Sequence, residues 1–147
     1  MAETDDGFSG LLIYMPRDTF TEKALENLTR LAEIKGSLIG HAFGIELPKL
    51  VITKDMVDFP WFPETTDPDE VNAYTQFVDK LCEMARTQKR VVAEAVETDN
   101  EKYAFRCFLL RLGFIGSEYK RTRNILLRNL TGNSAFRHGV KKQNNRR

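Results

Sequence analysis

The spacing of apolar residues divides the chain into a small extended part and a larger helical part. Leu11–Met15 is a short apolar run that ends at Pro16, and residues 49–61 contain two apolar stretches on either side of Lys54–Asp55, as the strands of a hairpin do. In residues 19–43 and 68–130 the apolar positions recur every three or four residues, which is typical of helices that bury one face. This order predicts a small sheet covered by helices.

Residues 49–61 indicate a β-hairpin with a two-residue turn at Lys54–Asp55. Such a turn pairs Ile52 with Val57 across the two strands. Because side chains alternate along a strand, one set of apolar residues then lies on a single face of the hairpin. This set is Leu50, Ile52, Val57, Phe59 and Trp61.

Four helices are predicted from their start and stop signals. The first begins at Thr19, which has the capping-box spacing to Glu22, and ends at Gly44. Gly36 and Gly40 lie inside it and indicate a kink or a close helix contact. The other predicted boundaries are an N-cap at Asp67 before Pro68 with an extension toward Ala95, a capping box at Thr98 and Glu101 with a stop at Gly113, and a cap at Ser117 with a stop at Gly132.

We therefore predict an α+β, mainly α fold, in which a short strand plus a β-hairpin form a small antiparallel sheet packed against about four helices. The 147 residues correspond to one domain. We assign residues 11–137 to this domain, residues 1–10 to a flexible leader and residues 138–147 to a disordered basic tail, because the ends contain few apolar residues.

The composition, with 41% hydrophobic and 29% charged residues, is that of an ordinary globular protein. No apolar run approaches the roughly 20 residues that span a bilayer, and the acidic start lacks the features of a signal peptide. Cys82 and Cys107 provide no metal or disulfide framework. We expect a soluble, cytoplasmic protein that does not enter a membrane.

Motifs that carry chemistry are sparse. The turn from Gly113 to Gly116 follows a predicted helix rather than a strand, so a helix stop and a helix start explain its glycines better than a phosphate loop does. His41 and His138 are not at metal-ligand spacing from each other or from a cysteine. Since no nucleophile, base and orienting group come together, we expect no catalytic residues, metal or cofactor.

Charge is strongly segregated along the chain. Residues 1–99 contain 10 Lys or Arg and 19 Asp or Glu, whereas residues 100–147 contain 12 and 2, so the two parts carry −9 and +10. A cationic helix followed by a cationic tail favours contact with nucleic-acid phosphates. The alternative is that this face attracts the acidic part of the same chain. The predicted nucleic-acid-binding residues are Lys120, Arg121, Arg123, Asn124, Arg128, Arg137, Lys141 and Lys142.

Trp61 and Phe62, between two prolines, are candidate partner-binding side chains. In the alternative, Phe59 and Trp61 seal the core of the sheet, and Phe62, which is opposite in phase, is the exposed residue.

Several stretches together carry a family resemblance. They are residues 15–28, residues 100–116, residues 130–136 and the sequence Phe59-Pro60-Trp61-Phe62. On these residues the chain resembles virulence-related proteins carried on integrative and conjugative elements of gut Firmicutes, over most of residues 11–140. It looks like the C-terminal domain of longer members. The resemblance implies a small accessory protein of mobile DNA and transfers no catalytic residues.

Two functional hypotheses follow. The first is a non-enzymatic accessory protein that associates with nucleic acid through the basic C-terminal helix and tail. The alternative is a protein-interaction or inhibitor module that acts on a host or transfer-machinery protein, through the Phe62 region or the basic face. The sequence does not determine the oligomeric state.

Overall fold

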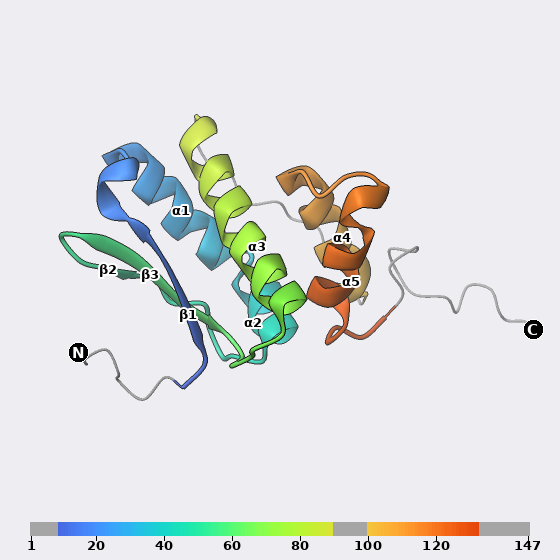
Figure 1. The fold of residues 1–147 in the computed structure, drawn as a ribbon. Coiled ribbons are helices and arrows are strands. Elements are labelled where there is room, and N and C mark those ends of the chain that lie inside the picture. Colours follow the sequence, from blue (N-terminus) through green and yellow to red (C-terminus); the bar gives the residue numbers. More distant parts are fainter. Residues whose placement is uncertain (1–8, 90–99, 133–147) are drawn as a thin grey trace, which may run out of the picture.

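The structure, a computed structural model, describes residues 9–89 and 100–132. Its strands are β1 (Leu11–Pro16), β2 (Val51–Ile52) and β3 (Met56–Phe62), and its helices are α1 (Glu22–Ile34), α2 (Gly36–Phe43), α3 (Pro68–Thr87), α4 (Glu101–Leu112) and α5 (Lys120–Leu127). Figure 1 shows the sheet on one side, α1, α2 and α3 in the middle, and α4 and α5 on the far side. The predicted α+β, mainly helical fold is confirmed.

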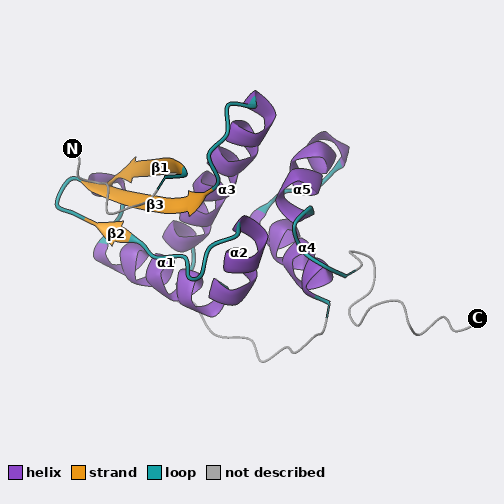
Figure 2. Cartoon of the chain, turned by 90° about the horizontal axis from the view of Figure 1, so that it is seen from below, coloured by secondary structure: helices purple, strands orange, loops and turns teal. Residues whose placement is uncertain are grey.

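The three strands are antiparallel and lie in the order β1-β3-β2. The predicted hairpin register is confirmed, because Ile52 pairs with Val57 and the Thr53 N–H donates to the Met56 carbonyl at 2.9 Å. Viewed from below in Figure 2, β3 lies between β1 and β2. The register between β1 and β3 shifts once, between Leu11 and Ile13.

This shift explains a wrong prediction about Phe62. Leu11 pairs with Phe62 and Ile13 pairs with Phe59, so β3 holds one extra residue there, as in a β-bulge. The bulge reverses the alternation, and Phe62 points to the same side as Phe59. Phe62 is therefore buried, with 1% of its surface exposed, although the sequence predicted it to be accessible.

Ile52 pairs with Val57 as predicted, but 39% of its surface is exposed. It lies on a two-residue edge strand that packs mainly against β3. Val57, Phe59 and Trp61 of the same predicted face are fully buried. The core therefore lies under the central strand β3 rather than under the whole hairpin.

The first predicted helix is two helices. The predicted start at Thr19 is wrong, since Thr19 belongs to a short 3-10 turn, and the Thr21 hydroxyl caps α1 by accepting the Ala24 N–H at 3.0 Å. The chain breaks at Lys35, between α1 and α2. This break lies next to Gly36, where a kink was one predicted alternative, and Gly40 lies close to loop backbone rather than to a helix, since a Cβ there would lie 2.8 Å from the Ile45 carbonyl oxygen.

The boundaries of α3 and α4 agree in part with those predicted. Asp67 caps α3 as predicted, but α3 ends at Thr87, and the predicted extension toward Ala95 falls outside the described residues. Asn100, and not Thr98, caps α4, by accepting the Tyr103 N–H at 3.1 Å. Gly113 ends α4 with a φ of +113°, as predicted.

The predicted limits of the last helix are wrong at both ends. Ser117 begins a 3-10 turn, closed by a hydrogen bond from the Tyr119 N–H to the Gly116 carbonyl, and α5 starts at Lys120. It ends at Leu127, before the predicted stop at Gly132. The short length of α5 restricts its cationic side chains to about two turns.

Aromatic rings join the three layers into one core. The Phe62 ring stacks on the Tyr74 ring of α3, with centroids 4.8 Å apart, and contacts Phe43 of α2 at the same distance. Phe77 of α3 continues the chain to Phe105 of α4 at 5.9 Å. Since such contacts add to the burial of large apolar side chains, they fix the sheet, α3 and α4 relative to one another.

Candidate interaction surfaces

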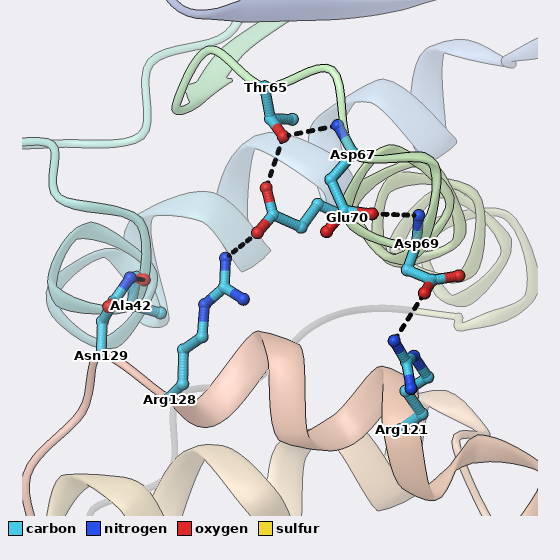
Figure 3. A network of polar contacts seen from close by, with 8 residues as sticks. All are labelled: Ala42, Thr65, Asp67, Asp69, Glu70, Arg121, Arg128 and Asn129. Atoms are coloured by element: carbon cyan, nitrogen blue, oxygen red, sulfur yellow. Dashed lines mark hydrogen bonds and ion pairs between the residues drawn. The ribbon is translucent and has the colours of Figure 1, made fainter.

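A polar network surrounds the N-terminus of α3 (Figure 3). The Asp67 carboxylate accepts the Asp69 N–H at 3.0 Å, and the Asp67 N–H donates to the Thr65 hydroxyl oxygen at 3.0 Å. The Thr65 hydroxyl in turn donates to Glu70. Because free N–H groups and the helix dipole favour negative charge at this end, α3 holds Asp69 and Glu70 in place here.

Two arginines of the basic segment pair with these carboxylates. Arg128 donates to Glu70 at 2.7 Å, and Arg121 lies 2.7 Å from Asp69. The hydrogen bond from Thr65, followed by that from Arg128, lowers the pKa of Glu70 below its ordinary value, while the bond to Glu70 raises the pKa of Arg128. The predicted cations thus meet the acidic part of the same chain, which is the alternative left open by the sequence.

The two ion pairs differ in exposure. The Glu70 side chain is 19% exposed and that of Arg128 is 44% exposed. The Arg121–Asp69 pair is open, with side-chain exposures of 76% and 51%. An exposed pair of this kind is weak in water, so Arg121 is held far less firmly than Arg128.

The other predicted nucleic-acid-binding residues fall into three groups. Arg123 donates to the carbonyl oxygens of Phe114 and Gly116, at 2.8 and 3.0 Å, and so closes the turn before α5. Lys120 and Asn124 are exposed. Arg137, Lys141 and Lys142 lie outside the residues that the structure describes.

The predicted partner-binding pair, Trp61 and Phe62, is not on the surface. Trp61 is fully buried, and its indole N–H donates to the Lys49 carbonyl at 2.7 Å. Phe62 is enclosed by Phe43 and Tyr74. Both side chains act in the core, so neither offers a contact to a partner.

The sheet offers a different surface, on the side away from the helices. Figures 1 and 2 show the helices on one side of the sheet, and the opposite side, here called the open face, carries exposed apolar side chains. Leu12 is 37% exposed, Tyr14 58% and Val51 41%. Asp58 lies at the centre, since it pairs with Tyr14 on one neighbouring strand and with Val51 on the other.

The Asp58 carboxylate has no cation or hydrogen-bond donor among the described residues. Partial burial raises its pKa above the ordinary value, and desolvation is the cause. This surface could not be predicted from the sequence, because Leu11–Met15 is apolar at every position and does not show which side of the strand faces out. The available signal was Asp58, because a charged residue between the apolar Val57 and Phe59 indicates that its side of the strand faces out.

The described residues show little chemistry of other kinds. None of their His, Cys, Asp and Glu side chains form a group of three that would hold a metal ion. Burial raises the pKa of the Cys82 thiol to about 12, so this thiol is unreactive. No described helix combines the length and the hydropathy of a membrane span.

No protein-family model, no curated protein and no solved structure matches the chain. The resemblance to virulence-related proteins of integrative and conjugative elements stays a prediction.

Proposed function

We propose that the protein is a non-enzymatic protein-interaction module that binds a partner protein through the open face of its sheet. The observation that carries this proposal is the Asp58 carboxylate, which has no partner among the described residues and lies between the exposed Tyr14 and Val51, on the face that also carries the exposed Leu12. Exposed apolar side chains that gather on one face are typical of interaction sites. In agreement with the resemblance, we propose a cytoplasmic accessory protein of a mobile genetic element.

The chemistry of the face defines the partner. Leu12, Tyr14 and Val51 favour an apolar partner surface, and Tyr14 provides a large side chain with a polar end. Covering Asp58 without a counter-charge would bury an unpaired carboxylate, which is costly. The partner therefore presents a lysine or arginine within an apolar patch. We propose a host or transfer-machinery protein as its source.

Affinity capture with matched variants tests this proposal. The bait proteins are the wild type, Asp58→Lys and Asp55→Lys, each used on a nuclease-treated lysate of a gut Firmicute. Asp55 is the control because it lies at the exposed hairpin tip and its side chain has no partner among the described residues. We expect a protein that the wild type and Asp55→Lys recover in equal amounts and that Asp58→Lys does not recover.

The captured protein is then purified and titrated into isotope-labelled protein. Shifts of the amide signals of residues 12–14, 51 and 58 support the proposal. Recovery of the same proteins by all three bait proteins, or shifts confined to α4 and α5, would contradict it.

Nucleic-acid binding is a second candidate, favoured by a different observation. Lys102, Arg106 and Lys120 have no side-chain partner within the described ranges, so their charges are available to an external anion. Lys102 and Arg106 lie on α4, and Lys120 begins α5, next in sequence to the exposed Arg121. Of the three, Lys120 belongs to the predicted nucleic-acid-binding residues, and Lys102 and Arg106 add to them.

Duplex DNA of random sequence tests this second candidate. Binding that weakens steeply with salt, and that Lys102→Ala, Arg106→Ala and Lys120→Ala together reduce, would support it. The control is Lys49→Ala with Lys54→Ala, which removes exposed lysines near the hairpin. Absence of binding at low salt, or equal loss in the control, contradicts it.

A further inference from the structure

Strand β1 is an edge of the sheet, with β3 as its one strand neighbour among the described residues. The Arg17 N–H, next after β1, donates to the Asp55 carbonyl at 2.9 Å. In an antiparallel ladder, alternate residues point their N–H and C=O groups to the same neighbour. The backbone groups of Ile13 and Met15 therefore face β3, and those of Leu12 and Tyr14 face away from the sheet.

This edge has little protection against pairing on its outward side, because the one bulge in its described pairing lies in β3. Natural edge strands carry charged side chains, prolines or bulges that discourage contact with another strand. β1 has no charged residue between Leu11 and Pro16, and its proline stands at the last position. The exposed side chains of Leu12 and Tyr14 add apolar surface next to the unpaired backbone groups.

We infer that β1 pairs with β1 of a second copy of this chain, antiparallel and with Ile13 opposite Ile13. In this register Leu12 of each copy lies opposite Tyr14 of the other, and both residues have outward-facing N–H and C=O groups. Each Leu12–Tyr14 pair then exchanges both hydrogen bonds. The paired side chains lie on the same face, where an aromatic ring meets an aliphatic one.

The backbone favours this register over its neighbour. Centring the pairing on Tyr14 would set Leu12 opposite Pro16, which has no N–H to donate. The Pro16 carbonyl already accepts the Thr19 hydroxyl at 2.8 Å. The register centred on Ile13 avoids both losses, and no charged residue of β1 opposes another.

Pairing would join the two sheets into one, with both open faces on the same side. A contact along one short strand buries less surface than the roughly 1,200 Å² of a stable interface, so the dimer is weak and depends on concentration. The inference goes beyond the proposed function. It concerns the edge of the sheet, and its failure leaves binding at Asp58 unaffected.

Disulfide trapping tests the register. Leu12→Cys and Tyr14→Cys proteins are made in a Cys107→Ser background, because Cys107 is half-buried, whereas the Cys82 thiol is buried. Opposed residues of a hydrogen-bonded pair have Cα atoms about 5.5 Å apart, a spacing that a disulfide accommodates. We expect the mixture of the two proteins to form several-fold more covalent dimer than either protein alone.

Trapping of Tyr14→Cys with itself above the mixture would overturn the register, and equal trapping by a Val51→Cys control would overturn the contact. Sedimentation velocity gives a second measurement without cysteines, over about 10 µM to about 1 mM. We expect the wild type to associate within this range. We expect the double variant Leu12→Lys/Tyr14→Lys, which sets like charges opposite each other, to remain monomeric. A wild type that is monomeric throughout would overturn the proposal.

Discussion

Glu70 and Asp58 differ in their partners and in the direction of their pKa shifts. At the junction of α3 and α5, Glu70 accepts hydrogen bonds from Thr65 and Arg128, and its pKa is lowered. On the open face of the sheet, Asp58 has no counter-charge among the described residues, and its pKa is raised. One carboxylate is used to hold the fold together, and the other remains available.

Part of the charge segregation along the chain is used inside the fold. Acidic and basic parts of a chain attract each other when folding brings them together, and here Arg121 and Arg128 meet Asp69 and Glu70. The charge of the basic part, residues 100–147, is therefore partly neutralised within the fold. Asp58, which lies within the acidic part, gains no partner among the described residues, because Arg121 and Arg128 lie on α5 or directly after it, and α5 packs against α3 away from the sheet.

The largest effect is expected on the covered side of the strand that carries Asp58. Phe62→Ala removes a ring packed between Phe43 and Tyr74, and such substitutions cost about 3–5 kcal/mol of unfolding free energy. Tyr14→Ala, on the open face, is the control and should change the unfolding free energy by less than about 1 kcal/mol. Urea unfolding measures both, and equal losses would contradict the distinction between the two faces.

The next largest effects are expected at the two ion pairs of α5, where the two arginines should contribute differently to stability. Arg121→Ala removes a highly exposed pair and should lower the unfolding free energy by no more than about 1 kcal/mol. Arg128→Ala should lower the melting temperature more, because the mostly covered Glu70 then lacks its cation. Thermal melts at low and high salt test this order. The reverse order would show that exposure does not decide the strength of these pairs.

Glu70→Gln should remove a pH-dependent contribution to stability. Because the folded state lowers the pKa of Glu70 from its ordinary 4.5, the ionised group stabilises the fold at neutral pH. This contribution is lost as the pH falls below 4.5 and through the lowered pKa. The difference in melting temperature between wild type and variant should therefore be full at pH 7 and shrink in acid. A constant difference would exclude the ionised group as its source.

Asp58→Asn should have the smallest effect and the opposite sign. The folded state raises the pKa of Asp58, so ionisation opposes folding above that pKa and no longer does so below it. The variant should be slightly more stable than the wild type at pH 7, by less than about 0.5 kcal/mol, with the gain shrinking in acid. Chemical unfolding at pH 7 and in acid measures it. A loss of stability at pH 7 would indicate a partner for Asp58.

Much of the secondary structure could be predicted because its signals are local. The turn at Lys54–Asp55, the Asp67 cap and the glycine at the end of α4 each depend on hydrogen bonds or backbone angles within a few residues. The predicted helix start at Thr19 was wrong because the nearby Thr21 provides the cap, and the predicted start at Ser117 was wrong because a 3-10 turn precedes α5. Most of the candidate site could not be predicted, because exposure depends on what packs against each face.

The sequence by itself determined the order of strands and helices, the hairpin register and the presence of a strongly basic segment. Only the tertiary structure decided which of those charges meet. Arg128 and Glu70 are 58 positions apart, and a bulge in β3 between Phe59 and Phe62 turned Phe62 inward. The physical reason is that caps and turns form within neighbouring residues, whereas burial and ion pairing depend on segments that only folding brings together.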